Sequence, residues 1–197
     1  MADGPIKRVL ASIVANGLVY DVLQRAVGTE GFDRHIKKSL GPIARGCIVI
    51  DAGGGTGMSR HIWPQDCDYV NVDNDPEKLA AFARKQLPGQ AVLGDITALD
   101  YRAGSVDYVF TKYVSHHLDD ESLEGFLKDS SRVLKADGKL VFFDPVYSAD
   151  RVLSKVLWRY DRGAHPRPDT LLRSVPNSAK PVADEQQTGL LKEAVPT

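Results

Sequence analysis

Apolar residues recur along the chain in short runs that are separated by amphipathic stretches. Ile48-Val49-Ile50 is apolar at consecutive positions, as is typical of a strand buried on both faces of a parallel sheet. The further predicted strands are Tyr69–Val72, Ala91–Leu93, Val106–Phe110 and Lys139–Phe143. Because helical patterns alternate with these five runs, we predict an α/β fold: an open, mostly parallel sheet with helices on both faces.

The helical stretches carry recognisable start and stop signals. One helix is predicted over Phe32–Leu40, where Gly41-Pro42 ends it. Asp75 caps the next helix, with Pro76 in its first turn. Asp119 or Asp120 caps a further helix, which carries Leu123, Phe126, Leu127, Val133 and Leu134 toward the sheet and stops at Asp137-Gly138.

These elements divide the chain into three segments. Residues 1–45 are predicted to be N-terminal helices that pack on the core, since apolar residues between Ile6 and Leu18 recur at helical spacing. Residues 46–160 form the core itself. Residues 161–197 are rich in proline and lack aromatic residues, so we predict a poorly ordered tail without two more strands. Strand five would then have an exposed edge, which a homodimer or another partner could cover.

The amino-acid composition disfavours several classes of function. The 197 residues contain 25 Lys and Arg against 26 Asp and Glu, a net charge of -1 that gives no reason to expect nucleic acid as a partner. Two cysteines, Cys47 and Cys67, are too few for a disulfide framework and lack metal-ligand spacing, so we expect inert thiols, no metal and a reducing cytoplasm. No apolar run approaches the roughly 20 residues that span a bilayer, and we expect no signal peptide.

The most informative motif is Asp51-Ala52-Gly53-Gly54-Gly55-Thr56-Gly57, directly after the first strand. A triphosphate-binding loop would need Lys and then Ser or Thr after the last glycine, but Met58 and Ser59 stand there. The dinucleotide fingerprint also fails at its sixth position. The nearest cation is Arg60, so a pyrophosphate site stays open but is not favoured.

This motif resembles the first motif of the class I S-adenosylmethionine-dependent methyltransferases, an acidic residue followed by alternating glycines. The second strand ends in Val72-Asp73-Asn74-Asp75-Pro76, similar to the acidic strand end of that family. Gly94-Asp95-Ile96 resembles its adenine-contacting segment. Ser105–Thr111 with His116–Asp120 resembles its fourth strand and the loop that faces the methyl group, and Leu134–Leu140 its turn into strand five.

The resemblance covers about Tyr20 to Asp150 and implies a Rossmann-like sheet with strand order 3-2-1-4-5, apparently without the last two strands of the family. It implies S-adenosylmethionine as cofactor, with segment 1–45 lining the cofactor site. Asp51 would help to hold the amino group, and backbone amides of the following helix the carboxylate. Asp73 would bind the ribose hydroxyls. The residues assigned to the cofactor are Asp51, Gly53, Gly54, Gly55, Gly57, Asp73, Asn74, Asp95, Ile96 and Thr111.

The sequence gives fewer indications of the residues that would contact the methyl acceptor. His116 and His117 are candidates for a general base, although one could instead pack on the sheet while the other is solvated. Tyr20 and Tyr113 are candidates for the substrate pocket. We therefore expect a methyltransferase acting on an O, N or C nucleophile of a small molecule. The alternative is a truncated cofactor-binding or interaction module with weak catalysis.

Overall fold

The computed structural model describes residues 29–144 and 191–194. The strands are β1 (Ile48–Ala52), β2 (Asp68–Asp73), β3 (Gln90–Leu93), β4 (Val106–Lys112), β5 (Leu134–Phe143) and β6 (Leu191–Ala194). The helices are α3 (Thr29–Leu40), α4 (Pro76–Arg84) and α5 (Asp120–Val133), with short 3₁₀ turns η1 (Arg60–Ile62) and η2 (Ser115–His117). Within this part of the chain no helix is long and apolar enough to cross a membrane.

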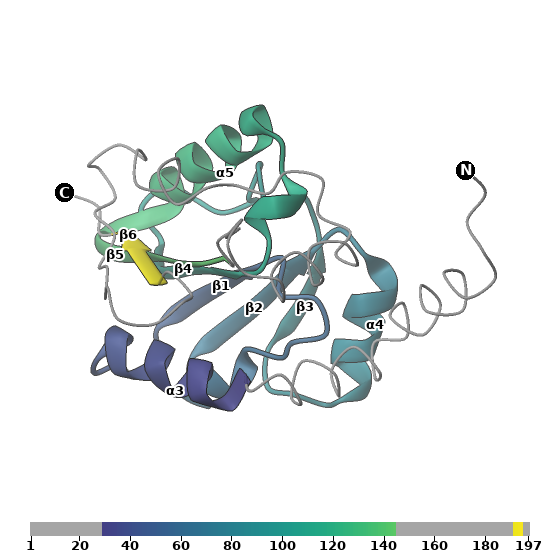
Figure 1. Ribbon diagram of the computed structural model, residues 1–197, viewed down its shortest axis with the longest axis vertical. Coiled ribbons are helices and arrows are strands. Elements are labelled where there is room, and N and C mark those ends of the chain that lie inside the picture. The colour runs from purple at the N-terminus through teal and green to yellow at the C-terminus, as the bar shows by residue number, and fades with distance from the viewer. Residues whose placement is uncertain (1–28, 145–190, 195–197) are drawn as a thin grey trace, which may run out of the picture.

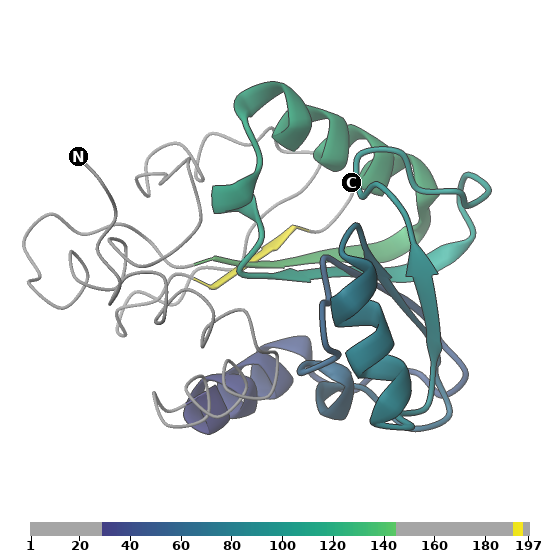
Figure 2. The same ribbon diagram turned by 90° about the vertical axis from the view of Figure 1, so that its right-hand side faces the viewer.

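All six strands form one sheet in the order β3-β2-β1-β4-β5-β6. The α5 helix covers one face, and α3 and α4 cover the other (Figures 1 and 2). Side chains of β1 alternate between the two layers: Ile50 joins the apolar cluster under α5, whereas Val49 joins the cluster under α3. The central strands β1, β2 and β4 are buried on both faces, and the predicted motif begins at the end of β1.

The prediction of five parallel strands in the order 3-2-1-4-5 is confirmed. Local signals acted as expected. Asp75 caps α4 by accepting hydrogen bonds from the backbone N–H groups of Glu77 and Lys78, and Asp119 caps α5. Gly41, with φ of +64°, follows the last residue of α3.

The boundary between α5 and β5 differs from the prediction. The helix ends at Val133, and β5 begins at Leu134 rather than at Lys139. Leu134 pairs with Val106, and the register then shifts before Tyr108 pairs with Lys139. Leu134 is apolar and buried in both interpretations, so its hydrophobicity could not reveal that its backbone had become extended.

The edge of β5 also differs from the prediction. The short strand β6 pairs antiparallel with β5 from Leu140 to Phe143, so the chain itself covers the edge that we expected to be exposed. The expectation of an exposed edge is therefore wrong along these residues, and a partner is not needed to cover them. The expected N-terminal helix, Tyr20 and most of the Pro-rich tail lie outside the described residues.

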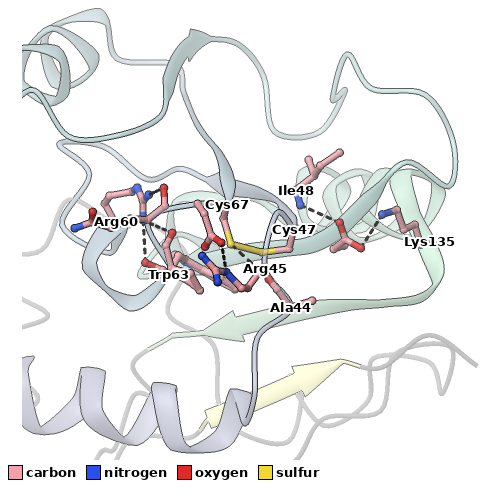
Figure 3. The surroundings of a disulfide bond; sticks show 12 residues. Ala44, Arg45, Cys47, Ile48, Arg60, Trp63, Cys67 and Lys135 are labelled. Atoms are coloured by element: carbon pink, nitrogen blue, oxygen red, sulfur yellow. Dashed lines mark hydrogen bonds and ion pairs between the residues drawn. A yellow bond between two sulfur atoms is a disulfide. The ribbon is translucent and has the colours of Figure 1, made fainter.

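The cysteines form a disulfide, and our expectation of two thiols is wrong. Cys47 and Cys67 stand where β1 and β2 begin, with Cα atoms 4.8 Å apart (Figure 3). The two strands are paired in parallel from Ile48 and Asp68 onward, and this register brings the preceding residues together. The bond lies at the amino ends of the strands, away from the glycine motif. The predicted strand order made β1 and β2 neighbours, but it did not give the register that places Cys47 beside Cys67.

Reduction of this disulfide is expected to lower the free energy of unfolding by about 3 kcal/mol, because the bond closes a loop of 20 residues in the unfolded chain. Denaturant unfolding with and without a thiol reductant measures the difference. The double variant Cys47→Ala/Cys67→Ala serves as control and should not respond to the reductant. Equal stability of the oxidised and reduced wild-type protein would contradict this prediction.

Candidate cofactor site

The glycine motif lies at the point where the strand order of the sheet reverses. From β1 the chain crosses to β2 on one side, while β4 pairs with β1 on the other side. In open parallel sheets, ligands bind beyond the carboxyl ends of the strands at this switch point. The backbone N–H of Gly53 donates to the carbonyl oxygen of Val72 over 2.7 Å, so the start of the loop is fixed to the end of β2.

Two of the glycines are required by close contacts. At Gly57, with φ of +76°, a Cβ atom would collide with the ring of Phe82 in α4. At Gly54 a Cβ would lie 2.6 Å from the side-chain oxygen of Asn71 and 2.6 Å from Cγ of Asp51. The loop therefore packs against polar side chains of β1 and β2, and its glycines serve the turn itself as well as any ligand.

Asp51 is the central acid of the site. It is 1% exposed and accepts a hydrogen bond from the Tyr69 hydroxyl on β2. Burial raises the pKa of the Asp51 carboxyl to about 7; the Tyr69 hydrogen bond and the charge of Lys112 oppose this rise, and the charge of Asp73 adds to it. A carboxyl group with this pKa is only partly ionised near neutral pH. A cation bound beside it would favour the ionised form, so the carboxyl would release its proton and attract the cation.

Asp73 ends β2 and turns its carboxylate toward the loop. Its Oδ2 accepts from the backbone N–H of Gly55 over 2.8 Å, and its Oδ1 accepts from the N–H of Asp75 over 2.9 Å. A carboxylate offers about four acceptor positions, so two such bonds orient the group and leave capacity for a pair of hydroxyls. Asp73 thus lies where the sequence predicts it, next to the glycines.

The other residues predicted to bind the cofactor differ in their exposure and in their hydrogen bonds. Asp95 is exposed and accepts from the backbone N–H and the hydroxyl of Thr97, which is an ordinary turn, and Asn74 is also exposed. Ile96 is 8% exposed and joins the core under α5. Thr111 on β4 is 1% exposed, and its hydroxyl has no hydrogen-bond partner within the described structure. An adenine contact by Asp95 stays a prediction.

The loop after β4 lies against the glycine motif, because a Cβ on Gly53 would meet Val114 at 2.5 Å. Tyr113 in this loop has φ of +62°, a conformation that costs a non-glycine residue of order 1 kcal/mol or more. Its backbone N–H donates to the Phe143 carbonyl over 2.8 Å. The loop is thereby fixed to the end of β5 with a tyrosine held in a strained position.

The two histidines of this loop have different surroundings. His116 is 3% exposed and its Nδ1 lies 2.7 Å from Oδ1 of Asp144, just beyond β5. The other oxygen of Asp144 accepts from the N–H of Ser115 over 2.5 Å. His117 is exposed, and its ring centroid lies 4.2 Å from that of His116. One histidine is packed and the other solvated, the arrangement that the sequence offered as the alternative to catalysis.

Sequence reasoning missed a cluster of charged residues beside the site. Lys112, the last residue of β4, donates to Oδ1 of Asp33 on α3 over 2.6 Å, and Nε2 of His61 lies 3.1 Å from Oδ2 of the same carboxylate. Burial acts to raise the pKa of Asp33, but hydrogen bonds from His61 and Lys112 outweigh it and the pKa is lowered. A lysine at the end of a mostly buried strand was the available signal.

Arg60, the nearest cation after the glycine loop, is not placed to bind a pyrophosphate. Its guanidinium donates to the carbonyl oxygens of Trp63, Pro64, Gln65 and Pro88 and stacks over the Tyr69 ring. It is 3% exposed and holds the turn after the glycine loop, so it does not present its charge to a phosphate. Among the described residues, no cluster of three or more His, Cys, Asp or Glu side chains could hold a metal ion.

The doubly covered parallel sheet, with an acid-flanked glycine loop at its switch point, is the arrangement that the resemblance to class I methyltransferases predicts, and comparisons with known proteins agree. Residues 50–142 match the family described as methyltransferase domain. This part of the chain, just under half of its length, is therefore similar to the class I S-adenosylmethionine-dependent methyltransferases.

Relatives and structures extend this finding. An uncharacterized methyltransferase of Oceanobacillus iheyensis is 28% identical over 101 residues, which are 50% of this chain and 47% of that protein. The chain thus spans about half the length of this curated relative. The fold is similar to that of the PH0226 protein of Pyrococcus horikoshii, with a TM-score of 0.71, 16% identity and coverage of 88% and 92% of the two chains. It is also similar to geranyl diphosphate C-methyltransferase of Streptomyces coelicolor, with a TM-score of 0.70, 13% identity and coverage of 90% and 84%.

Asp51→Asn is expected to stabilise the ligand-free protein at pH 8 and to make little difference near pH 4. The folded-state pKa of about 7 exceeds the unfolded value, so the contribution of Asp51 to stability is complete below pH 4 and is lost as pH rises through 7. Each unit of this difference corresponds to about 1.4 kcal/mol. Asparagine stays neutral and can still accept from Tyr69.

Thermal unfolding of wild type and variant between pH 4 and pH 8.5 tests this expectation. Asp68→Asn, which changes an exposed aspartate of the same sheet, is the matched control and should leave the pH dependence unchanged. A melting temperature of Asp51→Asn that stays at or below wild type throughout the range would show that the carboxyl is not destabilised by burial.

Proposed function

We propose that this chain binds S-adenosylmethionine and transfers its methyl group to an O, N or C nucleophile of a small-molecule acceptor. The observation that carries the proposal is the pair of buried acids, Asp51 and Asp73, on either side of the glycine loop, while Arg60 is bound to carbonyl oxygens. The cofactor has a cationic sulfur, an ammonium group and a ribose but no phosphate, so an acid-lined loop suits it.

Each acid has a separate task in this proposal. Asp51 receives the ammonium group, directly or through a water molecule, and Asp73 accepts hydrogen bonds from the ribose hydroxyls. Leu93, the last residue of β3, is 63% exposed and is the register partner of Asp73. It lies at the strand end next to the ribose acid, and an exposed leucine there offers an apolar surface to a purine ring.

The bound cofactor supplies an activated methyl group on sulfur. What remains for the protein is to align a nucleophile with that methyl group and to exclude water. The loop of Tyr113 to His117 fits this role, because it lies against Gly53 and is fixed to the end of β5. His116 with Asp144 is our candidate for accepting a proton from the nucleophile, since a carboxylate at Nδ1 fixes the tautomer of the ring.

Our proposal for the chemical class of the methyl acceptor is based on the net charge of the chain. The near balance of acidic and basic residues gives no reason to expect a nucleic acid as acceptor, and a small metabolite remains our proposal. The alternative is a cofactor-binding module without turnover. Binding of the cofactor without product from any acceptor in a broad panel of hydroxyl, amine and carbon nucleophiles would favour the module.

Binding is tested with S-adenosylhomocysteine, the demethylated product, which should raise the melting temperature of the wild-type protein. Asp73→Ala is expected to weaken binding by about 1.5–3 kcal/mol, because the ribose hydroxyls lose a charged acceptor. Asp107→Ala is the matched control: this acid also accepts a backbone N–H, that of Ile48, but at the opposite edge of the sheet. Equal affinities of the two variants would remove Asp73 from the site.

The histidine proposal is tested once a methylated product is detected. His116→Ala should lower kcat by about 10²- to 10⁴-fold and leave the affinity for S-adenosylhomocysteine unchanged. His117→Ala is the control and should change kcat by less than about 5-fold, because His117 is exposed, whereas His116 is buried and oriented by Asp144. A small loss of kcat in both variants would exclude a histidine base.

A further inference from the structure

The glycine loop has no side chains with which to fix its own shape. Gly53, Gly54 and Gly55 follow one another, and Gly53 and Gly55 have φ of +73° and +55°. Glycine adopts positive and negative φ about equally readily, so a run of three leaves the backbone of the loop several conformations. The interactions that select one conformation must come from the neighbouring strands.

Two side chains of β2 bind the backbone of Gly55. The Nδ2 group of Asn71 donates to the Gly55 carbonyl oxygen over 2.8 Å, and Oδ2 of Asp73 accepts from the Gly55 N–H over 2.8 Å. Asn71 and Asp73 are two positions apart in the strand, so their side chains leave the same face of the sheet. The peptide groups before and after the Gly55 Cα are thereby both held by β2.

The other half of the Asn71 amide is not satisfied. Asn71 is 0% exposed, and its Oδ1 has no hydrogen-bond partner among the described residues. This oxygen lies against Gly54, where a Cβ would be 2.6 Å away from it. Rotating the amide by half a turn would not help, because Oδ1 would then face the Gly55 carbonyl oxygen. A buried acceptor without a donor costs stability, so the benefit of an asparagine here lies in its bond to Gly55.

We propose that Asn71 is a positioning residue of the cofactor site: it fixes the Gly55 backbone and, through it, the orientation in which Asp73 accepts the ribose hydroxyls. The inference rests on the proposed function and deepens it, because it names the residue that prepares the acid for the sugar. The sequence by itself predicts only a buried strand at this position, since the bond from Asn71 to Gly55 joins two different elements.

The effect of Asn71 reaches the ligand through two successive hydrogen bonds. Without Asn71 the Gly55 carbonyl loses its donor, and the peptide is free to turn until another donor or water satisfies it. Asp73 then loses the Gly55 N–H, one of the two backbone groups that orient its carboxylate, and keeps that of Asp75. The carboxylate must be ordered again when the ribose binds, which weakens this part of the interaction.

The test compares two ligands that differ only at the ribose. Calorimetry on the full chain measures the Kd of S-adenosylhomocysteine and of its 2′,3′-dideoxy analogue. Wild type should bind S-adenosylhomocysteine about 10- to 100-fold more tightly. Asn71→Leu, which keeps the size of the side chain but removes the amide, should reduce this preference about 5- to 10-fold and bind the analogue like wild type. Ser130→Ala is the matched control and should behave as wild type, because its hydroxyl is also buried without a partner in the described structure, but on α5.

A double-mutant cycle tests whether Asn71 acts through Asp73. Asp73→Ala should abolish the preference for the ribose hydroxyls, and adding Asn71→Leu should not change the ratio of the two Kd values further. The proposal is overturned if Asn71→Leu alone keeps the wild-type ratio, or if it weakens both ligands by the same factor. If Asn71→Leu does not fold, Asn71→Ser, whose side chain is shorter and has no amide, decides by the same criteria. A wild-type protein that binds neither ligand, or both equally, would instead reject the proposed function.

Discussion

The structure depends on the burial of two carboxyl groups at the carboxyl edge of a parallel sheet. Asp51 lies under the glycine loop with Tyr69, and Asp73 holds that loop through the backbone N–H of Gly55. Carboxylates in such a place are costly unless other groups bond to them. The loop must therefore contain glycine at position 54, because a side chain there would collide with Asp51 and Asn71. One electrostatic constraint thus determines the backbone of the motif and the charge of the ligand that fits it.

Sequence reasoning succeeded where local chemistry is independent of the rest of the fold. The buried strands, the Asp75 cap with Pro76 and the Gly41 stop depend on neighbouring residues, and each lies at or close to its predicted place. The acids and glycines of the site were also found, because strand order brings the ends of β1 and β2 together. The boundary at Leu134 was missed because a buried leucine fits a helix and a strand equally well.

Features that join distant parts of the chain could not be predicted in this way. The disulfide of Cys47 with Cys67 depends on the exact register of β1 on β2, which the strand order alone does not give, and the pairing of β6 with β5 joins residues that are about 50 positions apart in sequence. The same holds for Asp33, Lys112 and His61, which come from three elements. Each of these residues is unremarkable by itself in the sequence. Only the tertiary structure places them in contact.

The amino ends and the carboxyl ends of the strands differ in the interactions that their residues make. At the amino edge, a disulfide, the ion pair of Arg45 with Asp66 and the bond from Lys135 to Asp107 connect neighbouring elements (Figure 3). At the carboxyl edge, a partly neutralised acid, a buried lysine pair and a tyrosine with positive φ are held in unfavourable environments. Such features persist only if the surrounding structure is rigid. At the carboxyl edge these groups are held by the hydrogen bond from Tyr69 to Asp51, by the ion pair of Lys112 with Asp33, and by the bond from the Tyr113 N–H to the Phe143 carbonyl.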